Sequence, residues 1–260
     1  MFLEKDTAEM RDHTESEYMS RRRFFVPAVR NGEAEISGGE ARHLTRVLRV
    51  EAGQRYEISD NNNVYLSEIM LARKQRVVFR TLERLPLRPA PVRLHLYAAL
   101  IKFDHFEWMI EKTTELGVER IVPVRAERTE RGLDQAAPKR LERWRRIGLE
   151  ASQQSRRDRL PEIEELVPFD DVLTAKAACR FVCEEEAGAP ALLASIPATR
   201  SPDDTVAVLI GPEGGWTETE RSALGDSGWT AVSLGPQVLR AETAAIAVLA
   251  ILSAAWLVTK

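Results

Sequence analysis

The order of segments in the last third of the chain constrains the fold more than any other feature. A mostly apolar stretch at 205–210 runs into a glycine-bearing loop at 211–215, and a second stretch at 231–234 runs into another at 235–240. A helical pattern follows each loop. Repeated alternation of strand, loop and helix favours an α/β domain with a largely parallel sheet, in which ligands bind beyond the carboxyl ends of the strands.

The same alternation begins soon after residue 90. Strands are expected at 92–100, 120–124, 180–185, 205–211 and 231–235. Four helices are expected: one opened by a capping box of Asp104 with Glu107, one opened by Pro138, one over Thr217–Leu224 opened by a capping box of Thr217 with Glu220, and one over Ala241–Val258.

The first part of the chain has a different character. Residues 1–20 are acidic and lack a period, so we expect a mobile tail. Residues 21–86 contain four short strand patterns and one helical pattern at Glu40–Arg49, which predict a compact β-barrel. The helical spacing places His43, Leu44, Val47 and Leu48 inward. The proline-rich stretch at 86–91 predicts a stiff linker, and residues 87–260 form the predicted α/β domain.

Composition excludes several classes of protein. Hydrophobic residues make up 44% and charged residues 30% of the chain, which is typical of a folded globular protein. Two cysteines cannot frame a disulfide scaffold, and no export signal opens the chain, so we expect a cytoplasmic protein. The longest apolar stretch, 244–258, is shorter than the roughly 20 residues of a membrane-spanning helix.

Charge is divided unevenly along the chain. The net charge is +6 over residues 21–90 and +4 over 91–160, but −9 over 161–260. A basic first half is what a protein that holds a polyanion needs. The alternative is that arginine is simply a favoured surface residue here.

The glycine loops match none of the common phosphate or nucleophile motifs. No lysine follows them as in a P-loop, they come too late for a dinucleotide-binding loop, and a nucleophile-elbow motif is absent from the sequence. The cysteines and histidines lack zinc-ligand spacing, so no metal is expected. Either loop alone could be an ordinary tight turn from strand to helix.

Six blocks, read together in this order, resemble the bacterial 16S ribosomal RNA uracil-N3 methyltransferases. They are Arg22-Arg23-Phe24-Phe25-Val26, His43-Leu44-x-x-Val47-Leu48-Arg49, Glu111 to Val118, Gln154-Ser155-x-Arg157, Ile210 to Gly215, and Leu234-Gly235-x-x-Val238 to Ala244. The resemblance runs from about residue 21 to the end. The family belongs to the trefoil-knotted SPOUT class.

The resemblance implies a PUA-like β-barrel that binds RNA, followed by a knotted α/β methyltransferase domain that works as a homodimer without a metal. It implies methyl transfer from S-adenosyl-L-methionine to N3 of a uridine in 16S rRNA, of the uridine-1498 class, within the assembled small ribosomal subunit. The expected cofactor shell consists of Ile210, Gly211, Glu213, Gly214, Gly215, Ser233, Leu234, Gly235, Val238 and Leu239.

Two residues are candidates for catalysis. Loss of the N3 proton puts negative charge on O2 and O4 of the uracil, which a cation can stabilise. We expect Arg240 to do this or to position a phosphate, and Glu242 or a water to accept the proton. Alternatively, Glu242 is a carboxylate favoured by the dipole in the first turn of a helix.

Phosphate contacts are expected from the basic half of the chain, and Phe24 or Phe25 is a candidate for stacking on a base. The alternative is burial in the barrel, which we expect for one of the two. The candidate phosphate contacts are Arg22, Arg23, Arg42, Arg46, Arg49, Arg125, Arg128, Arg156 and Arg157.

The chain departs from the family pattern at two places. The tail at 1–20 is extra, and Asp60-Asn61-Asn62-Asn63 replaces a stretch usually rich in glycine. Asparagine tolerates the left-handed backbone of such a turn, so we expect the turn to survive.

Two other functions remain open. One is a related knotted methyltransferase for transfer RNA or for a ribose 2′-hydroxyl. The other is a ribosome-assembly factor that kept the fold without catalysis.

Overall fold

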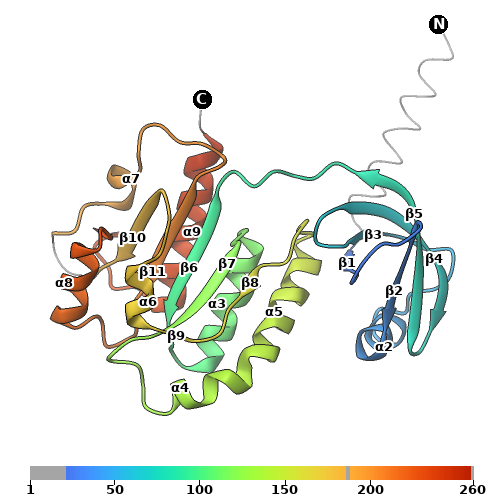
Figure 1. The fold of residues 1–260 in the computed structure, drawn as a ribbon, viewed down its shortest axis with the longest axis horizontal. Coiled ribbons are helices and arrows are strands. Elements are labelled where there is room, and N and C mark those ends of the chain that lie inside the picture. The colour runs from blue at the N-terminus through green and yellow to red at the C-terminus, as the bar shows by residue number, and fades with distance from the viewer. Residues whose placement is uncertain (1–21, 186–187, 259–260) are drawn as a thin grey trace, which may run out of the picture. The chain divides into compact units, whose positions relative to one another are not determined.

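The computed structural model describes residues 22–185 and 188–258, and the chain divides into two compact units (Figure 1). The N-terminal unit runs up to Arg88 and also includes Gln153–Arg159. The C-terminal unit consists of Pro89–Ser152 and the chain from Leu160 onward. The tail expected at 1–20 lies outside the described residues. Nothing in the sequence pattern predicted that residues 153–159 belong with the first unit.

Within residues 22–88 and 153–159, the N-terminal unit contains a five-stranded sheet and helix α2, where the sequence predicted four strands and one helix. The strand order is β1-β3-β4-β5-β2. Its elements are β1 (Arg23–Phe25), β2 (Glu33–Ser37), α2 (Gly38–Arg46), β3 (Arg55–Ser59), β4 (Val64–Arg73) and β5 (Arg76–Leu85).

Helix α2 is shorter than the helix predicted over Glu40–Arg49. It buries Ala41 and Leu44 against the sheet, as its apolar spacing requires. It ends at Arg46, so Val47 does not continue the buried face and is 64% exposed. The inward placement predicted for Val47 is therefore wrong.

The asparagine turn keeps its shape. Asn61 has φ +69°, in the left-handed region, and the backbone N–H groups of Asn62 and Asn63 donate to Oδ1 of Asp60 at 3.0 and 2.7 Å. The prediction that asparagine would preserve this turn is confirmed.

Both phenylalanines of β1 are core residues. Phe24 and Phe25 are buried, and the ring of Phe24 lies 5.0 Å from that of Tyr56 and 6.2 Å from that of Phe79, centroid to centroid. Stacking of Phe24 or Phe25 on an RNA base, one of the two sequence-based alternatives, is therefore wrong. The unit needs these rings because a sheet this small buries little apolar surface.

Arg23 is buried as well, and its guanidinium joins β1 to the 153–159 segment. Nη2 lies 2.8 Å from Oε2 of Glu57, and Nη1 donates to the carbonyl oxygen of Arg156 at 3.0 Å and to the carboxylate of Asp158. Glu57 also accepts from Nη2 of Arg156 at 2.9 Å. The prediction that Arg23 contacts RNA phosphate is wrong, because this guanidinium is enclosed between two carboxylates.

The C-terminal unit is an α/β fold, as the sequence predicted. Its strands pair in parallel in the order β12-β10-β11-β6-β7-β8, and β9 also pairs with β7. Its elements are β6 (Arg93–Ala99), α3 (Phe103–Glu115), β7 (Arg120–Arg125), α4 (Leu133–Ala136), η1 (Ala137–Arg140), α5 (Leu141–Gln154), β8 (Glu162–Ile163), β9 (Val167–Pro168), α6 (Phe169–Leu173), β10 (Cys179–Cys183), α7 (Leu192–Ser195), β11 (Thr205–Ile210), α8 (Glu218–Asp226), β12 (Thr230–Val232) and α9 (Ala241–Leu257). The last two residues of α5 are counted with the N-terminal unit.

Helices cover both faces of this sheet (Figure 1). Leu94, Leu96 and Ala98 of β6 pack in one cluster with apolar side chains of α3, α5 and α9. Tyr97 and Ala99, which alternate with them, pack in a second cluster with side chains of α6 and α8. Burial on both faces explains why the strands read as continuous apolar runs.

The two predicted capping boxes have different outcomes. Thr217 and Glu220 form one at the start of α8, as predicted. Helix α3 starts at Phe103 without a side-chain cap, so the box of Asp104 with Glu107 is wrong. Because the helix begins before Asp104, that residue is not the N-cap, and Glu107 accepts instead from Nε of Arg143 at 2.7 Å. No helix within the described ranges is long and apolar enough to cross a membrane.

The buried ion network yields a prediction on stability. Arg23→Ala leaves the carboxylates of Glu57 and Asp158 without their shared guanidinium, and removing one partner of a buried ion pair costs about 3–5 kcal/mol. Exposed Arg22 is the matched control, and Arg22→Ala should change the free energy of unfolding by less than about 0.5 kcal/mol. Denaturant unfolding measures both variants. Equal effects would contradict a structural role for Arg23.

Candidate functional site

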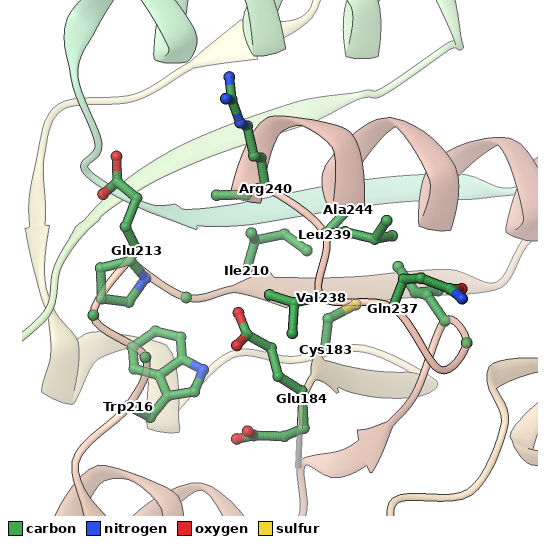
Figure 2. A pocket seen from close by; sticks show the side chains of 18 of the residues that line it. Cys183, Glu184, Ile210, Glu213, Trp216, Gln237, Val238, Leu239, Arg240 and Ala244 are labelled. Atoms are coloured by element: carbon green, nitrogen blue, oxygen red, sulfur yellow. The ribbon is translucent and has the colours of Figure 1, made fainter. Parts of the chain in front are cut away.

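A cavity of about 600 Å³ opens at the carboxyl edge of the sheet in the C-terminal unit, where β10, β11 and β12 end (Figure 2). Strand β10 lies between β11 and β12, so its end, Cys183-Glu184, falls between the two glycine loops. The cavity is lined by Cys183, Glu184, Glu185, Ile210, Gly211, Pro212, Glu213, Gly214, Gly215, Trp216, Arg221, Leu234, Gly235, Gln237, Val238, Leu239, Arg240, Ala241 and Ala244. Its size is that of a site for a small molecule or cofactor.

The loop after β11 needs its glycines because other groups approach the backbone closely. A Cβ on Gly211 would lie 3.0 Å from Nε1 of Trp216, and a Cβ on Gly214 would lie 3.3 Å from Cβ of Arg128. Gly215 has φ +68°, which side chains rarely adopt. Trp216 is 1% exposed and packs on the ring of Phe169, so it fixes the base of the loop.

The loop after β12 offers mainly backbone and apolar groups. Gly235 has φ +141°, and its N–H donates to Oγ of Ser233 at 3.2 Å. Val238 is 72% exposed at the cavity, which leaves an apolar side chain ready to cover a ligand. Arg240 is the N-cap residue of α9, and its exposed side chain extends away from the loop backbone (Figure 2).

The structure brings together most of the residues expected to hold the cofactor. Nine of the ten line the cavity: Ile210, Gly211, Glu213, Gly214, Gly215, Leu234, Gly235, Val238 and Leu239. Ser233 does not, because its hydroxyl turns back onto the loop and donates to the carbonyl oxygen of Gly235 at 3.1 Å.

Sequence reasoning missed the contribution of β10. Glu184 points into the cavity, and its Oε1 lies 3.5 Å from Nε of Arg221 (Figure 2). No glycine marks the end of β10, so the local pattern gave no signal. The only usable signal was its expected place as one of the parallel strands, whose carboxyl ends share an edge.

Burial, reinforced by the negative charge of Glu184, raises the pKa of the Cys183 thiol to about 12. The thiol is therefore neutral at pH 7 to 8. Because the thiolate is the nucleophilic form of cysteine, Cys183 lines the cavity without competing for an electrophile bound there.

The two catalytic candidates lie in different surroundings. Arg240 lines the cavity, whereas Glu242 does not. Glu242 is 5% exposed, and its Oε1 lies 2.8 Å from Nδ1 of His105. This pair links the first turn of α9 to the first turn of α3, a contact that neither segment of sequence predicted.

The candidate phosphate contacts are not equivalent. Exposed positions are occupied by Arg22, Arg42, Arg46, Arg49, Arg125 and Arg128. Arg156 pairs with Glu57, and Nε of Arg157 donates to the carbonyl oxygen of Arg159 at 3.0 Å. Within the part of the chain that the structure describes, no group of three or more His, Cys, Asp or Glu could hold a metal ion.

Comparison with known proteins identifies the class of protein to which this chain belongs. The RNA methyltransferase domain family matches residues 88–253, which include the whole cavity lining. A ribosomal RNA small subunit methyltransferase E from Bacillus subtilis is 29% identical over 244 residues, covering 89% of this chain and 95% of the relative. The protein of the same name from Synechocystis is 31% identical over 252 residues, covering 94% and 81%.

The fold matches as well. The crystal structure of ribosomal RNA small subunit methyltransferase E from Neisseria gonorrhoeae, bound to S-adenosyl methionine, superposes with a TM-score of 0.81. It is 27% identical and covers 91% of this chain and 98% of its own. The chain belongs to the ribosomal RNA small subunit methyltransferase E family.

The contact of Gly211 with Trp216 generates a prediction. Gly211→Ala forces Trp216 or the loop backbone to shift, because overpacking of this kind costs about 1–3 kcal/mol. If the loop relieves the strain by moving, the S-adenosyl donor expected from the sequence must restore the present backbone on binding, so its Kd should rise about 5- to 150-fold. Gly225 in α8 has open space around its Cβ position, so Gly225→Ala is the matched control and should leave the Kd unchanged. Calorimetric titration with S-adenosylhomocysteine measures both. Unchanged binding by Gly211→Ala would show that the ligand does not depend on this loop.

Proposed function

We propose that this protein transfers a methyl group from S-adenosyl-L-methionine to N3 of a uridine in 16S rRNA, with the assembled small ribosomal subunit as its substrate. Membership of the methyltransferase E family carries the proposal, because the match extends over nearly the whole chain and includes both glycine loops.

The cavity suits the donor. Its lining offers backbone groups of two glycine loops, apolar side chains of Ile210, Val238 and Leu239, and carboxylates such as Glu184 for polar or cationic groups. The Neisseria relative is crystallised with S-adenosyl methionine. The sulfonium already activates the methyl group, so the protein has to align donor with acceptor and exclude water.

Methyl transfer forms the N3–CH₃ bond and breaks the S–CH₃ bond, leaving S-adenosylhomocysteine. The N3 proton must leave, and negative charge spreads onto O2 and O4 of the uracil. Arg240, exposed at the cavity, supplies a guanidinium for these oxygens. N3 takes part in base pairing, so the uridine must be unpaired or swung out of its stack.

The contact with His105 changes the role proposed for Glu242. A carboxylate that is buried, outside the cavity lining and 2.8 Å from Nδ1 of His105 is poorly placed to reach N3. Glu242 instead positions the first turn of α9, and therefore Arg240, by holding that turn to α3. The proton passes to water.

The finer architecture is proposed from the family. The N-terminal unit serves as the PUA-like barrel that binds RNA, and the C-terminal unit as the trefoil-knotted SPOUT domain. The placement of β10 between β11 and β12 is compatible with the knot, because the chain that leaves β11 has to pass β10 to reach β12. Phosphate contacts come from exposed Arg22, Arg42, Arg46, Arg49 and Arg125. The proposed compartment is the cytoplasm, where ribosomes are assembled.

We also propose a homodimer. Trp108 on α3 is 45% exposed, and Leu257 and Val258 at the end of α9 are 70% and 74% exposed, so apolar side chains on two helices of one sheet face remain uncovered in a single chain. Light scattering should give twice the 29.3 kDa chain mass. A fully active species of 29.3 kDa would overturn the dimer.

A methylation assay tests the function. Labelled S-adenosylmethionine is incubated with unmodified small subunits or with free 16S RNA, and the product nucleosides are separated. The expected product is 3-methyluridine, with subunits preferred. Another methylated nucleoside would overturn the target. Donor binding without methylation of either substrate would favour the assembly factor.

Arg240→Ala tests the mechanism in the same assay. Loss of one group that stabilises developing charge lowers turnover by about 10²- to 10³-fold, while the donor Kd should stay within about twofold because the donor contacts are mainly backbone. Lys176→Ala, an exposed change on the loop after α6, is the matched control. Normal turnover of Arg240→Ala would remove Arg240 from the mechanism.

A further inference from the structure

The loop that follows β7 is fastened to the glycine loop that follows β11. Nη1 of Arg128 donates to the carbonyl oxygen of Gly214 at 2.8 Å and approaches that of Trp216 at 3.4 Å. Gly214 and Trp216 both line the cavity. Arg128 therefore touches the outer side of the loop that surrounds the proposed donor site.

Glu127, the residue before Arg128, makes two further hydrogen bonds that attach the β7 loop to the start of α8. The backbone N–H of Glu127 donates to Oε1 of Glu220 at 2.8 Å, and Oγ1 of Thr217 donates to Oε2 of Glu127 at 3.1 Å. Glu220 is 4% exposed and also caps α8. The backbone of the β7 loop is thus fixed to the end of the glycine loop independently of the Arg128 side chain.

The Arg128 side chain itself lies along the Gly214 peptide. A Cβ on Gly214 would come within 3.3 Å of Cβ and 3.4 Å of Cδ of Arg128. A glycine at this position is what allows the side chain to lie so close. A shift of Arg128 therefore moves, or releases, the Gly214 carbonyl.

Arg128 also faces solvent. The residue is exposed, and its bonds to the described residues use Nη1, whereas a guanidinium has five N–H donors. Arg125, the last residue of β7, and Arg131, on the same loop as Arg128, are exposed cations. An exposed guanidinium that uses one nitrogen on the loop keeps N–H donors for a bidentate contact with an RNA phosphate, and two further exposed cations are near it in sequence.

We propose that Arg128 couples the two ligands: it binds an RNA phosphate with its outer N–H groups while its inner group holds the Gly214 and Trp216 carbonyls, so that bound RNA tightens donor binding. This inference rests on the proposed function. In the absence of RNA, the long, exposed side chain of Arg128 must give up rotamer freedom whenever it holds the loop. The phosphate fixes the same rotamer, so the second ligand meets a loop that is already ordered.

Coupling of this kind is reciprocal, which makes it measurable from the donor side. Equilibrium dialysis with labelled S-adenosylhomocysteine gives its Kd for the full-length protein alone and for the protein saturated with unmodified small subunits. No methyl group is transferred, so both values are equilibrium constants. We expect the Kd of the wild type to fall about 5- to 20-fold when subunits are bound, within the usual range of coupling.

The variants separate coupling from simple support of the loop. The ratio compared is the Kd of the protein alone divided by its Kd with subunits bound. For Arg128→Ala this ratio should fall to about 1. Arg128→Lys keeps one cation but cannot grip carbonyl and phosphate together, so its ratio should also fall below about 3. Arg125→Ala is the matched control: it weakens RNA binding, yet at saturating subunits it should keep the wild-type ratio.

Three outcomes would overturn the proposal. The first is a wild-type ratio near 1, and the second is that Arg128→Ala weakens S-adenosylhomocysteine binding to the same degree with and without subunits. The third is that the ratio of Arg125→Ala also falls to about 1. Wild-type protein that forms 3-methyluridine yet shows a ratio of 1 would defeat the coupling alone. Protein that forms no 3-methyluridine would defeat the proposed function.

Discussion

The parallel pairing of β11 with β6 on one side and β10 on the other is the constraint on which the site depends. Because the strands of this sheet all run in one direction, the segments that follow β6, β7, β10, β11 and β12 emerge at a single edge. The start of α3, the Arg128 loop, Glu184 and both glycine loops come from five separate stretches of sequence. No local interaction would gather them, whereas the hydrogen-bond ladder between strands does so at once.

Strand and helix patterns were the most predictable part of the molecule, because burial on both faces leaves long apolar runs such as that of β11. The glycine loops were predictable because close backbone approach leaves few residue types acceptable. Contacts between segments that are distant in the sequence were not predictable. The spacing of Asp104 and Glu107 fits a capping box, but Arg143 lies close to Glu107 in the fold and takes its carboxylate. Likewise Arg23 follows exposed Arg22, and only the fold reveals Glu57 and Asp158 around it.

Counting charges along the sequence does not show which cations are available to a ligand, for the same reason. Arg23 and Arg156 share Glu57, Arg120 binds Glu164, and Arg143 binds Glu107, so these positive charges are paired within the fold. The fold, and not the count, decides which cations stay free for an RNA. Recognition of a folded RNA needs such cations, because phosphate contacts fix register only where their positions are fixed.

The attachment of residues 153–159 to the N-terminal unit has a consequence for the order in which the protein is made. Domains generally fold from the N-terminus as the ribosome releases them. Here Arg23 meets Asp158 only after residues 89–152, which belong to the other unit, have been synthesised. Completion of the first unit must therefore wait until the first segment of the second unit, residues 89–152, has been translated, so synthesis of the two units is interleaved.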